Sequence, residues 1–412
     1  MNELTHKEVV LLLAQLSALL FFGRMFAEGA RKLRQPAVAG ELLAGILLGP
    51  TILGSYAPSL FESLFPATGN SPAAFGAFIQ VSLVLLLFIA GIEVELHIVW
   101  RQGKKAFVTT AFGLIVPFLI GFAAVQIFPG FFDTGPGEER LIMGLFLGAS
   151  MAITALPVIV RILMDLNLFK TDVGMLIVAS AMISDLVGWI IFSIILSMLG
   201  HGGASMPLGS TILITLGFTI AMLTIGKKLI NNALPWINRN FAWPGGLLSI
   251  VIASCFIWAA FTEYIGIHAI FGAFIFGVAV GESIHFSERA KEIVHHFVNN
   301  IFSPLFFVSI GLKVNFIENF SLPLTAAIVG LAFLGKIVGS GFGARLSGYA
   351  PKTSLAIGFG MNARGAMEII LGLIALDYGL INEKLFVALV VMALVTSITS
   401  GPFMKMWIKE PS

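Results

Sequence analysis

One acidic residue stands alone in a long apolar stretch of the sequence. Asp185 lies in the run SAMISDLVGW (180–189), and no other ionisable residue occurs between positions 173 and 199. Two basic residues, Lys336 and Arg364, have similarly apolar surroundings. A charge at the centre of a membrane-spanning helix costs roughly 2.5 to 3.5 kcal/mol, so such residues usually face water or one another. One acid with two cations favours a titrating site over a purely structural ion pair.

The chemistry of such a carboxylate is competition between two ligands. It can hold either a proton or a small alkali cation, and that competition for one negative charge couples two ion fluxes. Thr154, Ser184 and carbonyl groups freed by a helix break at Pro157 would add the oxygen ligands that a dehydrated Na⁺ or K⁺ needs. We therefore predict that Asp185, Ser184 and Thr154 form an ion- and proton-binding site, with Asp185 as the ligand of the metal ion.

The remaining polar residues in apolar stretches have more ordinary interpretations. Glu368 follows Arg364 by four residues, a spacing that predicts an ion pair on one helix face. We expect Lys336, Arg364 and Glu368 to balance charge in the core of the protein. Glu41 is expected near a helix end, where water can solvate it, and His295 at an interfacial position.

Composition decides the class of protein. Of 412 residues, 58% are hydrophobic and only 11% charged, and the mean hydropathy is +0.97. Soluble globular domains carry about 25% charged residues. Cys255 is the only cysteine, which excludes an intramolecular disulfide and a thiolate metal cluster. The chain is predicted to be an all-α polytopic membrane protein with no cofactor and no nucleic-acid partner.

Apolar stretches of the length needed to cross a bilayer recur along the whole chain. The first runs into Arg31 and Lys32 without a small-residue cleavage site, so we expect a retained helix and not a signal peptide. Breaks at charged or Pro/Gly-rich segments predict thirteen helices, at about 7–23, 36–54, 75–98, 104–128, 140–165, 172–200, 208–229, 243–264, 266–283, 297–314, 321–347, 352–377 and 384–408.

The basic residues are unevenly distributed between the two sides of this predicted topology. Of the 24 Lys and Arg, only Lys7, Arg140, Lys313 and Lys384 fall on the side of the N-terminus, and Lys336 and Arg364 fall in mid-helix. All others lie on the opposite side. The positive-inside rule then predicts a multi-pass protein of the cell (inner) membrane, with the N-terminus outside and the C-terminus in the cytoplasm.

Glycine motifs suggest an internal repeat. They recur in the same order in the two halves of the chain: GELLAGILLG at 40–49 with GAFIFGVAVG at 272–281, GIEVE at 91 with GLKVN at 311, and GASM at 148 with GFGM at 358. An offset of seven helices would make helices 8–13 an inverted copy of helices 1–6. Inverted-topology repeats are typical of secondary transporters, whose site lies at the bilayer midplane on interrupted helices.

Candidate interruptions occur at equivalent places in the two repeats. Pro157 lies near the middle of the fifth predicted helix, where proline removes a backbone donor and clashes with the preceding turn. In the twelfth, the run GFGMNARGA holds Asn362 and Gly365, which are poor helix formers. Paired in this way, the two segments predict two discontinuous crossing helices more readily than ordinary kinks.

Five ordered motifs resemble the monovalent cation/proton antiporter superfamily. They are TALPVIVRILMDLNL from Thr154, SAMISDLVGW, SPLFFVSIGLKVN, GKIVGS and MNARGAMEIILGLIALDYGLI. The branch most similar holds bacterial Na⁺ or K⁺/H⁺ antiporters, potassium-efflux transporters and plant cation/H⁺ exchangers. By motif, Thr154 and Pro157 match the family's broken helix, Asp185 its ion-binding aspartate, Lys336 its mid-helix basic residue and Arg364 a polar or basic position of the second broken helix.

The resemblance also implies an architecture. It implies thirteen helices and a homodimer in which a core domain moves like an elevator. The domains would be a dimerisation domain of helices 1–3 (1–103) and 8–10 (241–320), a core transport domain of helices 4–6 (104–200) and 11–13 (321–412), and a linker helix 7 (201–240).

The sequence departs from the family pattern at one position. Electrogenic members usually have a second acid immediately before the aspartate, and electroneutral members commonly have asparagine there, whereas this chain has Ser184. Potassium-efflux members often carry a nucleotide-binding domain after the last helix. Because the chain stops at Ser412, we expect that regulation to be absent or removed.

The predicted function is therefore exchange of a monovalent cation, Na⁺ or K⁺, for H⁺. This is a transport activity and not an enzymatic one. With a single carboxylate, the simplest stoichiometry is one to one, which makes the exchange electroneutral. A channel-like potassium-efflux transporter is the alternative within transport. An intramembrane serine protease is disfavoured, because GASMA (148–152) lacks the last glycine of the nucleophile elbow and no histidine lies at mid-membrane depth. A non-transporting receptor with the same fold is a further alternative. Na⁺, K⁺ and Li⁺ are not distinguished by residue type.

Overall fold

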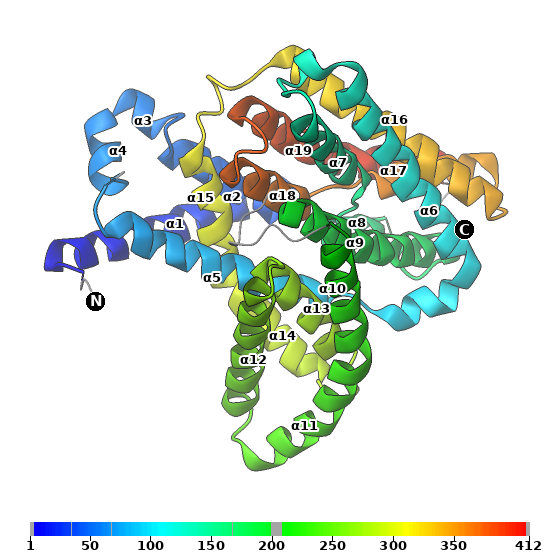
Figure 1. Ribbon diagram of the computed structural model, residues 1–412, viewed down its shortest axis with the longest axis horizontal. Coiled ribbons are helices and arrows are strands. Elements are labelled where there is room, and N and C mark those ends of the chain that lie inside the picture. Colours follow the sequence, from blue (N-terminus) through cyan, green and yellow to red (C-terminus); the bar gives the residue numbers. More distant parts are fainter. Residues whose placement is uncertain (1–3, 34, 67, 167, 199–207, 409–412) are drawn as a thin grey trace. The chain divides into compact units, whose positions relative to one another are not determined.

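The protein is helical throughout the part that the structure describes (Figure 1). This computed structural model describes residues 4–33, 35–66, 68–166, 168–198 and 208–408. The elements are α1 (His6–Lys32), α2 (Ala37–Leu48), α3 (Leu53–Tyr56), α4 (Pro58–Leu64), α5 (Ser71–Ile92), α6 (Leu96–Ile127), η1 (Pro129–Phe131), α7 (Glu138–Ala152), α8 (Leu156–Asp165), α9 (Asp172–Met198), α10 (Leu208–Ala221), η2 (Met222–Gly226), α11 (Lys227–Asn240), α12 (Gly245–Tyr264), α13 (Ala269–Gly281), α14 (Glu288–Phe297), η3 (Val298–Phe302), α15 (Ser303–Lys313), α16 (Leu322–Leu346), α17 (Pro351–Met361), α18 (Ala366–Asp377) and α19 (Glu383–Trp407).

Within the described ranges, eleven helical segments are long and apolar enough to cross a membrane, or twelve if the bent pair α17 and α18 forms one span. The protein is thus a multi-pass membrane protein. The span predicted at 266–283 is present as α13, but its 13 residues at 1.5 Å per residue reach only about 20 Å, short of a hydrocarbon core. Thirteen spans and an inverted repeat remain predictions.

Several predicted helix boundaries were wrong: the helix expected to end at 23 runs to Lys32, and the one expected to end at 229 continues through η2 and α11 to Asn240. The start expected at 104 follows directly on Gly103, whose φ 55° and ψ −131° interrupt the segment from Leu96 to Ile127. A positive φ of this kind is readily adopted only by glycine, so the kink falls at this residue. The helix expected at 297–314 begins at Glu288, because the amphipathic helix α14 continues through the π-helical turn η3 into α15.

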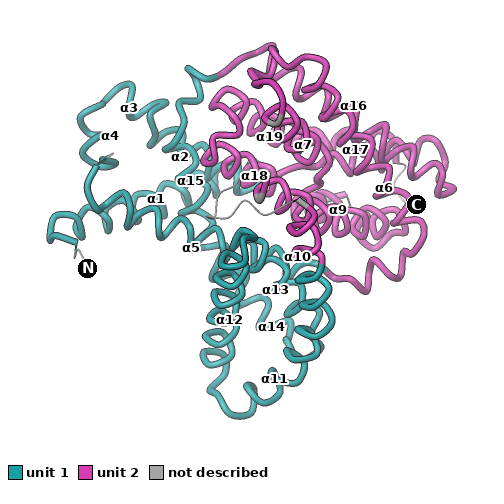
Figure 2. The backbone as a smooth tube through the Cα atoms, viewed as in Figure 1, with its two compact units in different colours: residues 1–94, 217–319 teal, residues 95–216, 320–412 magenta. Residues whose placement is uncertain are grey.

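The chain forms two compact units, each made of two segments (Figure 2). Unit 1 comprises residues 1–94 and 217–319, and unit 2 comprises residues 95–216 and 320–412.

Within unit 1, helices α2 and α15 pack backbone to backbone. A Cβ atom at Gly45 would collide with the carbonyl oxygen of Val308, and one at Gly49 would collide with that of Gly311. Small residues at helix contacts let membrane helices approach closely. The glycines of the 40–49 motif therefore serve packing. The same contact region buries Glu41, which is 4% exposed and accepts a hydrogen bond from Ser303 Oγ (2.9 Å), so the expectation of a solvated Glu41 was wrong.

We expect Gly45→Ala to destabilise unit 1, because the added methyl group must push the two backbones apart. Gly29→Ala on α1 is the matched control, since nothing lies within 4 Å of its Cβ position. The control should be neutral or stabilising by up to about 1 kcal/mol, the difference in helix propensity between glycine and alanine. Thermal unfolding of both variants in detergent checks this, and equal stability of the two would contradict the packing argument.

Within unit 2, α6 packs against α7, α9 and α16. Glycines on one face of α16 permit the contact with α6, because a Cβ atom at Gly335 would lie 2.8 Å from the Pro117 backbone and one at Gly339 would lie 2.5 Å from the Phe112 carbonyl oxygen. Lys336 follows the first of these glycines. The close approach of the two helices brings its side chain to the backbone of α6.

Candidate ion-binding site

Two interrupted helices cross at the centre of unit 2. Helix α7 ends at Ala152 and α8 begins at Leu156, with Pro157 as its second residue. Ile153 (φ −74°, ψ 151°) and Ala155 (φ −77°, ψ 106°) between them are extended. We refer to residues 153–155 as the first break.

The second break lies between α17 and α18. Helix α17 ends at Met361, α18 begins at Ala366, and the two are inclined by 46°. Asn362 and Gly365, which were expected to interrupt the helix, both lie in residues 362–365 between them. Gly365 has an extended backbone (φ −177°, ψ −139°).

Hydrogen bonds join the two breaks directly. The backbone N–H of Ala155 donates to the carbonyl oxygen of Ala363 (2.9 Å), and the hydroxyl of Thr154 donates to the carbonyl oxygen of Met361 (2.8 Å). A Cβ atom at Gly365 would lie 2.8 Å from Cγ2 of Val158, so the backbones are close where they cross. Thr154 therefore satisfies a carbonyl group that the end of α17 leaves without an intrahelical partner.

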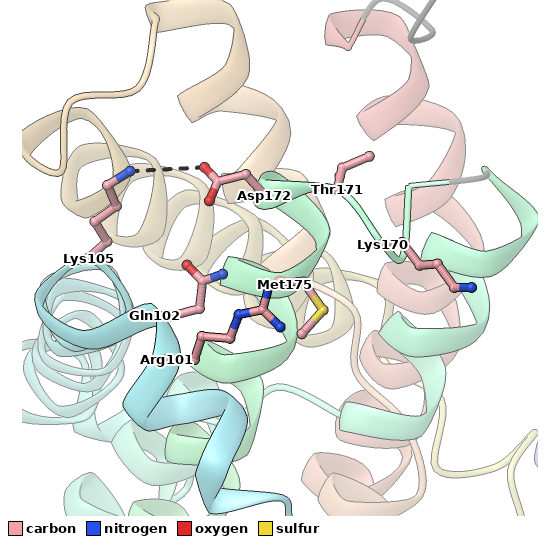
Figure 3. Close-up of a pocket in the computed structure, with 7 residues that line it drawn as sticks. All are labelled: Arg101, Gln102, Lys105, Lys170, Thr171, Asp172 and Met175. Atoms are coloured by element: carbon pink, nitrogen blue, oxygen red, sulfur yellow. Dashed lines mark ion pairs between the residues drawn. The ribbon is translucent and has the colours of Figure 1, made fainter.

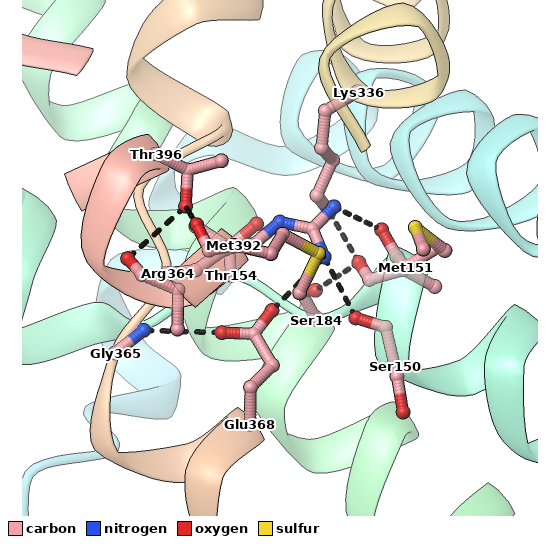
Figure 4. Close-up of polar contacts among 12 residues, drawn as sticks. Ser150, Met151, Thr154, Ser184, Lys336, Arg364, Gly365, Glu368, Met392 and Thr396 are labelled. Atoms are coloured by element: carbon pink, nitrogen blue, oxygen red, sulfur yellow. Dashed lines mark hydrogen bonds and ion pairs between the residues drawn. The ribbon is translucent and has the colours of Figure 1, made fainter. Parts of the chain in front are cut away.

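Lys336 and Arg364 bind the carbonyl groups at the end of α7 (Figure 4). Arg364 donates through Nη1 to the Ser150 carbonyl oxygen (2.8 Å) and through Nη2 to that of Met151 (2.6 Å). Lys336 Nζ donates to the Ala152 carbonyl oxygen and to that of Gly113 on α6 (2.9 Å). Both cations are fully buried. They satisfy three successive orphan carbonyls and compensate the negative end of the helix dipole.

Glu368 lies at the N-terminal end of a helix, whereas the two cations lie at the C-terminal end of one. It is buried in the first turn of α18, accepts a hydrogen bond from the Gly365 N–H (3.0 Å) and lies 3.2 Å from Arg364 Nη1. Its negative charge complements the positive end of the dipole. The expectation that Arg364 and Glu368 share a helix face needs correction, because Arg364 lies in the second break and reaches both Glu368 and the end of α7 from there.

Helix α9 places Ser184 and Asp185 at the level of the first break. Ser184 Oγ donates to the Ala152 carbonyl oxygen (3.2 Å), the same oxygen that Lys336 contacts. One turn later, a Cβ atom at Gly188 would lie 2.5 Å from Cγ1 of Ile153. Asp185 lies between these two contacts and is only 3% exposed.

Comparison with known proteins identifies the family. Residues 17–409 match the family model described as sodium/hydrogen exchanger, transmembrane. The chain belongs to this family. The resemblance predicted from the sequence motifs is thereby confirmed.

The relatives of this chain include cation/H⁺ antiporters of several organisms. It is 32% identical over 410 residues to cation/H(+) antiporter 17 of Arabidopsis thaliana, covering 97% of this chain and 48% of the relative. It is 30% identical over 404 residues to the Na(+)/H(+) antiporter NhaS4 of Synechocystis, covering 96% of each chain. It is 30% identical over 380 residues to K(+)/H(+) antiporter 1 of Saccharomyces cerevisiae, covering 90% and 43%. The chain thus spans about half the length of the plant and yeast relatives.

Solved structures share the fold of this chain. The sodium proton antiporter MjNhaP1 of Methanocaldococcus jannaschii at pH 8 aligns with a TM-score of 0.65 over 97% of both chains, at 17% sequence identity. Its electron-microscopy map aligns with a TM-score of 0.69 over 96% of both.

Some buried polar atoms near the two breaks and near Lys336 lack hydrogen-bond partners among the described residues. They include both side-chain polar atoms of Asn362 and the hydroxyl groups of Ser150 and Ser340. Buried polar atoms are usually bonded to protein or ordered water, so this region offers polar groups for water or an ion. Sequence reasoning missed Ser150 and Ser340, although Ser340 follows Lys336 by one helical turn, a spacing that could have identified it.

No cluster of three or more His, Cys, Asp or Glu side chains that could hold a metal ion occurs in the described part of the chain. Thr154 and Ser184 supply hydroxyl oxygens from two different elements, α9 and the first break. The residues predicted as site residues thus come from α9, α16, the two breaks and the first turns of α8 and α18, where Pro157 and Glu368 lie.

Proposed function

We propose that the chain exchanges a monovalent cation, Na⁺ or K⁺, for H⁺ across the membrane, with Asp185 as the site that the two ions share. The observation that carries this proposal is the placement of the Ser184–Asp185 pair on α9 beside the crossing of two interrupted helices. Ser184 and Lys336 both reach the last carbonyl oxygen of α7 there. Membership of the sodium/hydrogen exchanger family supports the proposal, as do relatives named as Na⁺/H⁺ and K⁺/H⁺ antiporters.

The charges in unit 2 support electroneutral exchange. Glu368 is paired with Arg364, and Lys336 is held by two carbonyl oxygens, so we assign ion binding to Asp185, the other buried carboxylate that the described part of unit 2 contains. The bound cation or proton would neutralise it equally, so the carrier would have the same net charge in both directions of transport. One ion would then exchange for one proton.

The two compact units support a division of labour. Unit 2 holds every residue of the proposed site and would be the transport domain, while unit 1 would form the homodimer contact. Alternating access would then expose the site to each side of the membrane in turn. The excess of Lys and Arg on one side supports an N-terminus outside and a C-terminus in the cytoplasm of the cell membrane.

A flux measurement in proteoliposomes tests the function. A pH-sensitive dye trapped inside the vesicles reports proton movement after Na⁺, K⁺ or Li⁺ is added outside. Each cation is tested with the membrane potential clamped and unclamped. We expect at least one of these cations to drive proton movement at a rate that the clamp does not change. Cation flux that follows voltage without moving protons would instead support the channel-like potassium-efflux alternative, and a rate that depends on the clamp would exclude one-to-one exchange.

A further inference from the structure

A basic pocket lies at the end of unit 2 where α6 and α9 begin (Figure 3). It is an open hollow with a volume of about 380 Å³, lined by Arg101, Gln102 and Lys105 of α6 and by Lys170, Thr171, Asp172 and Met175. We call it the α6–α9 pocket. Nothing in the proposed exchange mechanism uses it, because the ion site is built from the two breaks and the middle of α9.

The cations of the pocket come from separate segments. Arg101 precedes the kink at Gly103, Lys105 follows it, and Lys170 lies in the connection before α9. Together they give the lining three like charges, whose mutual repulsion a bound anion would relieve (Figure 3). Within the described parts of the chain, neither Arg101 nor Lys170 has a carboxylate within 4.0 Å.

The one acidic residue of the pocket is already engaged. Asp172 accepts a hydrogen bond from the Tyr349 hydroxyl (2.5 Å), and its Oδ2 lies 4.0 Å from Lys105 Nζ, which is also 5.1 Å from the centre of the Tyr349 ring. Burial and the neighbouring Asp172 carboxylate raise the pKa of Tyr349, so the hydroxyl remains a donor. Counting Asp172, the lining keeps two uncompensated positive charges.

We propose that the α6–α9 pocket binds a phosphoryl group. The planar guanidinium of Arg101 matches a phosphate in two-point contact, and the ammonium groups of Lys105 and Lys170 add point charges. A phosphate monoester carries about −1.5 to −2 charges near neutral pH, which balances the two uncompensated charges of the lining. The start of α9 adds the positive end of a helix dipole, although its Gly174 N–H already donates to the Thr171 hydroxyl (3.1 Å).

The same chemistry has two sources. One is the headgroup of an anionic phospholipid, because basic pockets beside membrane helices bind such headgroups. The other is a soluble phosphate or nucleotide. A basic cluster can also serve only to orient a membrane protein. That role requires neither a pocket nor particular residues, so Lys104 and Lys105 would contribute to it equally.

Binding to the full chain in detergent tests the proposal, with inorganic phosphate, ADP and short-chain phosphatidic acid as probes and short-chain phosphatidylcholine as the neutral lipid. We expect Arg101→Gln and Lys170→Gln each to weaken binding of the phosphoryl probes about tenfold, the loss of one charge-assisted contact. Lys104→Gln is the matched control: it removes the same charge from α6 at an exposed residue that does not line the pocket.

The possible outcomes distinguish a lipid ligand from a soluble one, and two of them would overturn the proposal. Binding of phosphatidic acid alone, lost in both variants, would identify a lipid site. Mutual competition among all three probes would identify a site open to soluble phosphates as well. Weakening by Lys104→Gln as large as that by the two pocket variants would overturn the proposal, as would binding of all three probes no tighter than that of phosphatidylcholine. Because the readout is binding, these results do not depend on cation exchange.

Discussion

Asp185→Asn is expected to abolish cation-driven proton movement in proteoliposomes. Asparagine has nearly the same shape but carries no charge, so it holds neither a proton nor an alkali cation strongly. The described residues offer no replacement, because Glu368 is held by Arg364 and the Gly365 N–H, and no cluster of three acidic or histidine ligands exists in them. The rate should fall to that of protein-free liposomes.

A matched variant separates loss of the site from loss of charge. Asp133→Asn removes a carboxylate charge from unit 2 at an exposed position, where asparagine can still accept the hydrogen bond from Asn382 Nδ2. It should keep the wild-type rate. If Asp185→Asn retains cation-driven exchange while the control behaves as expected, Asp185 is not the shared site.

Ligand-induced stabilisation provides a second test of Asp185. A cation that binds only the folded protein raises its stability as the concentration exceeds the dissociation constant. The transported cation should therefore raise the melting temperature of the wild type, and this increase should disappear in Asp185→Asn. An undiminished increase would place the cation elsewhere, whatever the transport assay gives.

The cost of burying charge explains why much of the candidate site could be found from the sequence. Lys336 and Arg364 stand out because few residues of their stretches are polar, and both are fully buried in the structure. The same argument failed for Glu41. Its position near a helix start suggested access to water, whereas packing of α2 on α15 covers it and Ser303 supplies its partner. A residue near a helix end can therefore be buried when glycines let a neighbouring helix pack closely against it.

The joining of the two breaks could not be read from local sequence. Thr154 and Met361 are separated by 207 positions, and the bond between them depends on how α7 and α17 cross. The position of Arg364 illustrates the same point. Its spacing to Glu368 is that of an intrahelical pair, but the backbone leaves the helix before Ala366, and the guanidinium is then free to reach the end of α7.

Arg364→Gln is expected to cause the largest loss of stability of any single change in unit 2. The guanidinium binds the carbonyl oxygens of Ser150 and Met151 as well as Glu368. Removing it leaves a fully buried carboxylate without its counter-charge and two helix-end carbonyls without a donor. Loss of one partner from a buried ion pair costs about 3 to 5 kcal/mol. The free energy of unfolding in mixed micelles measures this directly.

The double variant Arg364→Gln with Glu368→Gln distinguishes a lost charge balance from lost packing. It removes the stranded carboxylate, so it should be more stable than Arg364→Gln alone, since replacing a whole buried pair is often nearly neutral. Arg161→Gln, at an exposed position of α8, should change stability little and serves as the control for loss of a cation. If the double variant is no more stable than Arg364→Gln, the charge of Glu368 is not what Arg364 compensates. The main contribution of Arg364 is then its pair of hydrogen bonds to the end of α7, which hold the first break in place.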